Sequence, residues 1–183
     1  MRQKSQIQPI DVLDFWFSAE NQAKWFIKNS VFDEEITRKF LNIYDAAAKE
    51  QLDHWKKSAL GVLALIITLD QFPRNMFRNT AKSFVTDTKA LSLTKYAIAA
   101  KMDVGMSNDH KQFLYMPLMH SENLEDQKLG FELFTYDPQI QSYAKMHMDI
   151  IEKFGRFPHR NQILGRQSTE EELEFLKMPN AGF

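Results

Sequence analysis

Apolar side chains recur every three or four residues along most of this 183-residue chain, the spacing of one face of an α-helix. The clearest stripes lie within residues 33–49 and 140–154. No stretch of useful length alternates apolar and polar residues as a half-buried strand does. Glycine and proline number only 6 each, so turn-forming residues for hairpins are scarce. The sequence predicts an all-α fold of about eight to ten antiparallel helices in layered pairs.

Local signals place several helix ends. Pro9 suits the first turn of a helix, and Ser58 is a typical N-cap before the apolar run that follows. We expect that helix to stop near Phe72, because Pro73 disfavours helical geometry in the residue before it. Thr80 is predicted to open the next helix.

Further signals mark the second half of the chain. We expect Pro117 to kink or end a short helix that begins near Asp109. Asp137-Pro138 is predicted to begin a long helix that Gly155 ends. Ser168-Thr169, with glutamates three residues on, predicts a capping box at the start of a last helix.

The composition indicates one globular domain spanning residues 1–183. Hydrophobic residues make up 44% and charged residues 26%, and no linker interrupts the pattern. Cysteine is absent, which excludes disulfides and thiolate metal sites. The apolar run at 59–69 is shorter than the roughly 20 residues that span a bilayer, and no apolar stretch follows the basic start at Met1–Lys4. We therefore expect a cytoplasmic protein with no membrane segment.

One short motif occurs twice. Phe72-Pro73-Arg74-Asn75 returns as Phe157-Pro158-His159-Arg160-Asn161, with one residue inserted. Each copy follows an apolar helix and is trailed by a further arginine, Arg78 or Arg166. We call residues 72–78 and 157–166 the first and second Phe-Pro turns.

Positive charge gathers around both turns, although the net charge of the chain is −1. Residues 71–86 and 153–169 carry seven of the 23 lysines and arginines and no acid. Arginines in such turns can bond the free carbonyls at a helix end, which is a structural role. They can also converge on something negative, either an internal acid or an anionic ligand. Asp70, Glu122, Asp126 and the run Glu170–Glu172 are the internal candidates.

Other polar residues interrupt apolar surroundings. Asp70 continues an apolar helical stripe, and a buried carboxylate needs a partner, for which Arg74 is the nearest candidate. His147 lies within the stripe of the long helix, where a histidine bonded to a nearby carbonyl or carboxylate is the common case. His120-Ser121-Glu122 follows the Pro117 break. No recognised metal, nucleophile or phosphate-loop motif is present, so we predict no metal site and name no cofactor.

These strings resemble the bacterial family known as domain of unknown function 924. The resemblance rests on Phe15-Trp16-Phe17, Trp25-Phe26, the segment 69–75, His120-Ser121-Glu122 and the segment 155–161, and covers roughly Pro9 to Leu176. It implies a tetratricopeptide-like all-helical fold and no known activity or catalytic residues. One departure concerns a loop, because family members often carry glycine where this chain has Glu50-Gln51.

Our first functional hypothesis is a pocket that binds a small anionic molecule, with or without catalysis, formed by the two Phe-Pro turns and the His120–Glu122 turn. The predicted ligand-binding residues are the polar members of these three segments: Asp70, Arg74, Asn75, Arg78, His120, Glu122, Arg156, His159, Arg160, Asn161 and Arg166.

Two alternatives remain open at the level of sequence. The chain is an interaction module whose aromatic N-terminal residues bind a protein partner, or the arginines form a buried polar network with a purely structural role. Nucleic acid is a weaker candidate, because the net charge is balanced and the basic windows are short.

Overall fold

A computed structural model describes residues 7–179 and 182, so the basic N-terminal start lies outside the described residues. Among these residues helices alternate with turns and there is no strand, which confirms the all-α prediction. The α-helices are α1 (Pro9–Trp16), α2 (Ala19–Gln22), α3 (Ser30–Ala48), α4 (Ala59–Ile66), α5 (Phe72–Met76), α6 (Asp87–Ala99), α7 (Asn108–Met119), α8 (Leu124–Leu133), α9 (Pro138–Phe154) and α10 (Glu170–Phe175).

Short tight turns of helix join several of these elements. They are the 3₁₀ segments η1 (Asp53–Lys57), η3 (Ala81–Phe84), η4 (Phe134–Tyr136) and η5 (Pro158–Arg160) and the π-helical η2 (Ile67–Gln71). The caps follow the sequence signals, since Ser58 Oγ accepts from Gly61 N and Asp137 caps α9. Gly155 ends α9 with φ of 68°, a left-handed conformation that glycine adopts without strain.

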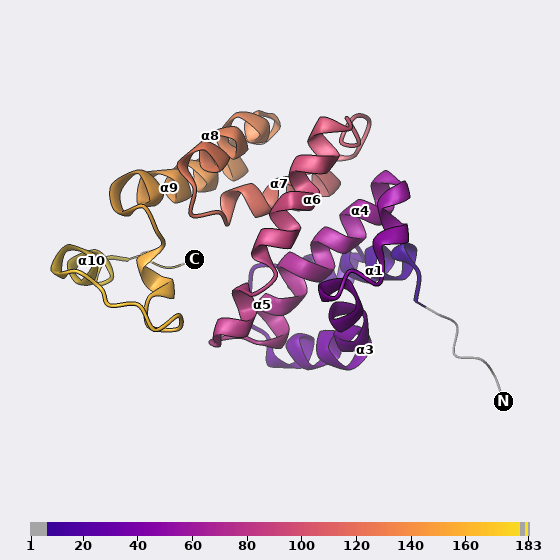
Figure 1. Cartoon of the computed structure of the whole chain (residues 1–183), viewed down its shortest axis with the longest axis horizontal. Helices are drawn as coiled ribbons and strands as arrows, with labels where there is room; N and C mark the ends of the chain where they lie inside the picture. Colours follow the sequence, from indigo (N-terminus) through magenta and orange to yellow (C-terminus); the bar gives the residue numbers. More distant parts are fainter. Residues whose placement is uncertain (1–6, 180–181, 183) are drawn as a thin grey trace.

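The main hydrophobic core runs through the apolar centre formed by α4 and η2. These two elements are buried along their whole described length apart from the first turn of α4. Helices α1, α3, α6 and α7 pack around them, and α7, α8 and α9 then stack in succession (Figure 1). Successive helices pack on one another from α6 to α9, whereas in the N-terminal half α1 packs on α4 and α3 packs on α5.

The predicted helix stop at Phe72 is wrong. The chain continues from α4 through the π-helical turn η2 directly into α5, with Pro73 in the first turn of α5. Proline carries no N–H, so this turn has one main-chain donor fewer. Side chains replace it, because Thr86 Oγ1 donates to the Leu69 carbonyl at 2.6 Å and the Arg74 guanidinium donates to the Asp70 carbonyl at 2.5 Å.

Two other predicted boundaries move. Helix α7 does not end at Pro117 but continues to Met119, two residues beyond the proline. Thr80 precedes only the short 3₁₀ turn η3, and the helix expected to begin there begins at Asp87 as α6. Both segments are held by tertiary packing that local signals do not report.

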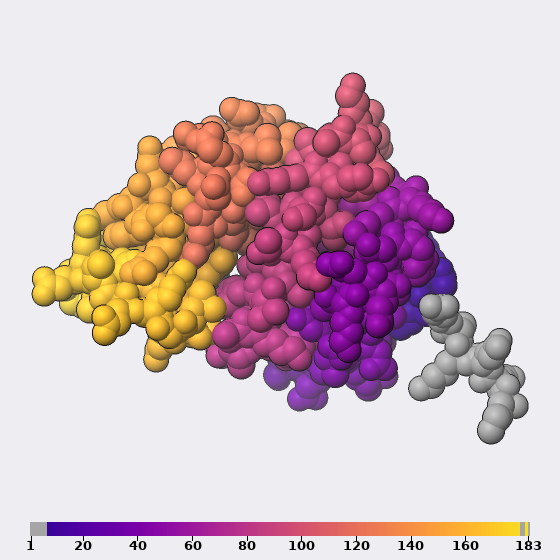
Figure 2. Space-filling model, viewed as in Figure 1, coloured from indigo at the N-terminus to yellow at the C-terminus, as the bar shows by residue number. Residues whose placement is uncertain are grey.

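The C-terminal segment forms a smaller apolar cluster of its own. Ile150, Ile151 and Phe157 are buried together, with Leu124, Phe154 and Phe175 packed against them. Figure 2 shows this part of the chain in yellow, meeting the magenta segment around residues 70–90 along a seam with a narrow opening. The two Phe-Pro turns face each other across that seam. The contacts made by the side chains in the seam therefore show whether the turns have a structural or a binding role.

Within the described residues, none of the helices has the length and apolar character needed to cross a bilayer.

Candidate functional site

Arg74, from the first Phe-Pro turn, is tied to two carboxylates. Its Nη1 and Nη2 donate to the two carboxylate oxygens of Asp87 at 3.0 Å each, a bidentate pair. Its Nη1 also lies 3.4 Å from Oδ1 of Asp70. Asp87 stands at the start of α6, where a carboxylate is favoured by the helix dipole. Arg74 is therefore fully engaged by internal partners.

Arg160, from the second Phe-Pro turn, reaches the same Asp87 but is not satisfied by it. Its guanidinium carbon lies 4.4 Å from the ring centre of Phe157 and 4.8 Å from that of Phe84. Its Nη1 is 3.7 Å from Asp87 Oδ2, beyond hydrogen-bonding distance. Among the described residues, its buried Nε has no hydrogen-bond partner. The side chain is nevertheless only 9% exposed.

The two turns thus converge on one carboxylate, as the repeated motif predicts. Arg74 occupies both oxygens of Asp87, which leaves Arg160 with a long ion pair and two aromatic contacts. Burial, with the neighbouring Arg74 charge, lowers the pKa of Arg160 to about 10. The guanidinium is still protonated at neutral pH, so the site holds a positive charge that its neighbours compensate incompletely.

His120 joins this cluster through Asp70. Its Nδ1 lies 2.8 Å from Asp70 Oδ1, and Asp70 is completely buried in η2. Gln71 Nε2 donates to the other Asp70 oxygen at 2.5 Å. Burial alone would raise the pKa of Asp70, but the charges of Arg74 and His120 outweigh burial and hold it below its usual range. Asp70 is therefore an ionised acceptor for His120.

Two more histidines surround Arg160. His147 Nδ1 lies 2.8 Å from the Tyr143 carbonyl, the contact expected of a satisfied core histidine, and burial lowers its pKa to about 3. Burial, followed by the charge of Arg160, lowers the pKa of His159 to about 4. Both imidazoles are neutral at pH 7. The charge of Arg160 lowers the pKa of both imidazoles, so these three side chains share one environment.

We call Asp70, Arg74, Asp87, His120, His147, His159 and Arg160 the arginine–histidine cluster. Five of its members were predicted to bind a ligand, and His147 was predicted to be a satisfied core histidine. The five are Asp70, Arg74, His120, His159 and Arg160. Asp87 was missed. It lies 13 residues beyond Arg74 in a segment that carried only a helix-start signal, and sequence spacing does not reveal that α6 brings it to both arginines.

Arg78 and Asn75 lie apart from this cluster. Both contact Asp33 in the first turn of α3, where Arg78 donates through Nε at 2.9 Å and Nη2 at 2.8 Å, and Asn75 Nδ2 donates at 2.8 Å. The contact joins α3 to the first Phe-Pro turn and is structural.

Arg156 and Asn161 also have structural partners. Arg156 donates to both oxygens of Glu172 through Nε and Nη2, at 2.6 and 2.8 Å. Asn161 Nδ2 lies 3.3 Å from the same carboxylate and donates to Ser168 at 3.0 Å. Within the acidic run Glu170–Glu172, Glu172 is therefore the residue that serves as a buried acceptor.

Arg166 and Glu122 pair with each other at the edge of the cluster. Arg166 donates through Nη1 and Nη2 to the Glu122 carboxylate at 2.7 and 2.9 Å, and Glu122 also accepts from the Phe157 main-chain N–H at 2.8 Å. Burial opposes ionisation, but Arg166 and this N–H lower the pKa of Glu122. In the second turn and just before it, Arg156 and Arg166 thus each pair with a separate acid, whereas Arg160 is bidentate to none.

The N-terminal aromatics proposed for partner binding mostly pack on one another. Trp16 is completely buried, and Phe15, Phe17 and Trp25 are partly buried against the main core. Of the five, Phe26 alone is exposed, at 68%. Phe15 and Phe17 also line the two cavities described next, so partner binding through these aromatics stays a prediction.

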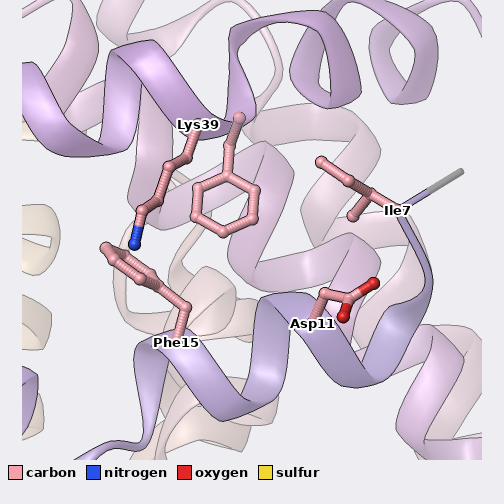
Figure 3. Close-up of a pocket in the computed structure, with 5 residues that line it drawn as sticks. Ile7, Asp11, Phe15 and Lys39 are labelled. Atoms are coloured by element: carbon pink, nitrogen blue, oxygen red, sulfur yellow. The ribbon is translucent and has the colours of Figure 1, made fainter. Parts of the chain in front are cut away.

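Two cavities described in the structure are remote from the cluster. One, of about 320 Å³, lies between α1 and α3 and is lined by Ile7, Asp11, Phe15, Lys39 and Phe40. Figure 3 shows the Lys39 amine over the Phe15 ring, 4.7 Å from its centre. The other, of about 390 Å³, lies beside α1 with Leu60 and His110 among its lining residues. Neither contains an unsatisfied buried charge.

Metal ligation is not supported by the arrangement of the side chains. Within the part of the chain that the structure describes, no group of three histidine or carboxylate side chains is positioned to hold an ion. The cluster's two arginines would moreover repel a cation.

Comparison with known proteins gives a family and no activity. The family model described as bacterial protein of unknown function (DUF924) matches residues 12–180. A solved structure of a protein of unknown function from Agrobacterium tumefaciens is 39% identical, with a TM-score of 0.88, over 92% of this chain and 96% of that one. Curated proteins gave no match. A match over residues 12–180, nearly the whole chain, makes this chain a member of the bacterial family of unknown function DUF924.

Proposed function

We propose that the protein binds a small oxyanion in the cytoplasm, with Arg160 as the principal contact and the arginine–histidine cluster as the site. The observation that carries the proposal is the incomplete compensation of Arg160. Its buried Nε has no hydrogen-bond partner among the described residues, and a buried polar atom left unpaired is costly and rarely retained without a use. A guanidinium offers paired N–H donors in the geometry that carboxylate and phosphate oxygens accept.

The surroundings of Arg160 support binding more than a structural role. Contact with the rings of Phe84 and Phe157 restricts the guanidinium before any ligand arrives, which reduces the entropy lost on binding. Asp87 would remain paired with Arg74 if Arg160 were absent, so Arg160 is not needed to neutralise it. By contrast, Arg78, Arg156 and Arg166 are each bidentate to one carboxylate.

The test is a titration of the purified protein with acetate and with inorganic phosphate, followed by calorimetry and thermal unfolding. We expect saturable binding in the wild type and none in Arg160→Met, which keeps the apolar stem between the rings but removes the charge. Because the charge is poorly compensated, Arg160→Met should melt at the same temperature as the wild type or higher.

Arg156→Met is the matched control. It removes a satisfied arginine from the same turn region and leaves the buried Glu172 without its charged partner. This variant should melt at a lower temperature and still bind the anion. If Arg160→Met is strongly destabilised while the wild type binds neither anion, the cluster is a structural network and the proposal is wrong.

A further inference from the structure

The cavity between α1 and α3 carries opposite charges at its two ends. Figure 3 shows the Asp11 carboxylate and Ile7 at one end, and the Lys39 amine with the Phe15 ring at the other. Phe40 completes the lining, and its ring centre is 4.9 Å from that of Phe15. We call this hollow the α1–α3 cavity. Its volume of about 320 Å³ lies at the small end of the roughly 300–1,000 Å³ that is typical of small-molecule sites.

The lining between the two charges is apolar and anchored in the protein. Phe40 is almost completely buried, and Ile7 and Phe15 are partly buried and pack against the main core. These side chains therefore form the apolar surface before any ligand arrives, so little ordering is needed on binding. An unbranched hydrocarbon chain that covers them gains affinity with each methylene group removed from water.

The Lys39 amine is positioned at its end of the cavity but keeps donors for a ligand. It lies 2.8 Å from Glu35 Oε1 and 4.7 Å from the centre of the Phe15 ring. An ammonium group has three N–H donors, and the contact with Glu35 uses one of them. The side chains of Lys39 and Glu35 are 39% and 32% exposed, so their pair is weak. Lys39 can therefore donate to a second carboxylate.

The Asp11 carboxylate also keeps capacity for a ligand. Its Oδ2 accepts from the main-chain N–H of Gln8 at 2.7 Å, as part of the capping box of α1. A carboxylate has about four acceptor positions on its two oxygens, and this contact uses one. Asp11 is exposed, so a ligand ammonium can reach the remaining positions from solvent.

We propose that the α1–α3 cavity binds an ω-amino acid, a molecule with a carboxylate at one end, an ammonium at the other and an unbranched apolar chain between them. The carboxylate accepts from Lys39, the ammonium donates to Asp11, and the chain covers the apolar lining. A molecule with a single charge matches one end of the cavity and is opposed by the like charge at the other. No residue of the arginine–histidine cluster takes part, so this inference is independent of the oxyanion site.

A series of ω-amino acids tests both the charges and their spacing. Binding of 4-aminobutanoate, 6-aminohexanoate and 8-aminooctanoate is measured by ligand-observed NMR, each against the carboxylate and the amine of the same chain length. We expect one ω-amino acid to bind about threefold or more tightly than both of its singly charged counterparts, a modest factor because exposed ion pairs are weak. Its addition should shift amide resonances of α1 and α3.

Two variants separate the ends of the cavity. Asp11→Asn keeps an oxygen for the Gln8 N–H but removes the charge, and it should reduce the affinity of the best ω-amino acid to that of the matched carboxylate. Lys39→Met should reduce it to that of the matched amine. The control is Lys128→Met, which removes an exposed lysine paired with Glu125 on α8 and should leave binding unchanged.

Equal affinity of every ω-amino acid and its singly charged counterparts would overturn the inference. So would an affinity that rises with chain length whatever the end groups, because the cavity would then bind apolar chains alone. Arg160→Met should bind the ω-amino acid as the wild type does. A loss of binding in Arg160→Met, with amide shifts in the second Phe-Pro turn, would place the ligand at the oxyanion site and also overturn the inference.

Discussion

At Glu50 the main chain adopts a left-handed conformation, with φ of 61°. Glu50 belongs to the pair Glu50-Gln51 at which relatives were expected to carry glycine, and a Cβ disfavours this conformation. The Glu50 carboxylate pairs with Lys89 at 2.7 Å, but both side chains are well exposed, so the pair adds little stability.

Glu50→Gly should therefore stabilise the protein. We expect a gain of roughly 0.5–1 kcal/mol, or a melting temperature a few degrees higher, from relief of the strained backbone. Asn79→Gly is the control, because Asn79 has φ of 62° but asparagine tolerates that conformation better. A thermal shift for Glu50→Gly no larger than that for Asn79→Gly would contradict the explanation.

Among the elements, the π-helical turn η2 does most to shape the site. It carries the helix from α4 into α5 past Pro73 and places Asp70 and Gln71 toward His120. π-Helical turns occur often at functional sites, where they redirect side chains. The Thr86 hydroxyl bonded to the Leu69 carbonyl makes the proline tolerable at this point.

Thr86→Val tests that dependence. The change keeps the shape of the side chain but leaves a buried carbonyl without its donor, so we expect a loss of about 1–3 kcal/mol in the free energy of unfolding. Chemical denaturation measures it. Ser92→Ala, which removes an exposed hydroxyl bonded within α6, should change stability little. Similar effects of the two substitutions would show that Thr86 has no special role.

Local signals predicted the helices whose ends are fixed by their own capping residues. The caps of α4, α9 and α10 and the glycine at the end of α9 were confirmed. Pro73 misled because the side chains of Arg74 and Thr86 donate to the Asp70 and Leu69 carbonyls, which local sequence does not show. For the site, the repeated motif predicted that two arginines meet, but Asp87 and Phe84 reach them only through the tertiary fold.

Across the whole molecule, the C-terminal segment is held by a small apolar cluster and by ion pairs. Glu172 is central to it, since its carboxylate accepts from Arg156, Asn161 and the main-chain N–H of Thr169. Arg156 is the main cause of a pKa for Glu172 of about 2, against an ordinary value of 4.5. Burial opposes this shift but does not overcome it.

Low pH should consequently reduce the stability that Glu172 gives to the C-terminal segment. The unfolded chain binds a proton at Glu172 near pH 4.5 and the folded chain only near pH 2, so the stabilisation is complete above pH 4.5 and is lost as the pH falls toward 2. We expect this residue to contribute up to ~3 kcal/mol to that loss. Melting temperatures between pH 5 and 2 should fall less steeply in Glu172→Gln. Parallel slopes in the two proteins would exclude Glu172 as a source.

The stacking of Arg160 between Phe84 and Phe157 has one more consequence, because the two rings come from opposite sides of the seam. If the two sides of the seam separated by the thickness of a ring, the Arg160 guanidinium would be free to rotate and would lose its fixed orientation. A bound anion would thus join distant stretches of polypeptide. By linkage, separating the two sides would cost more free energy in the bound protein than in the free protein, by as much as separation weakens binding.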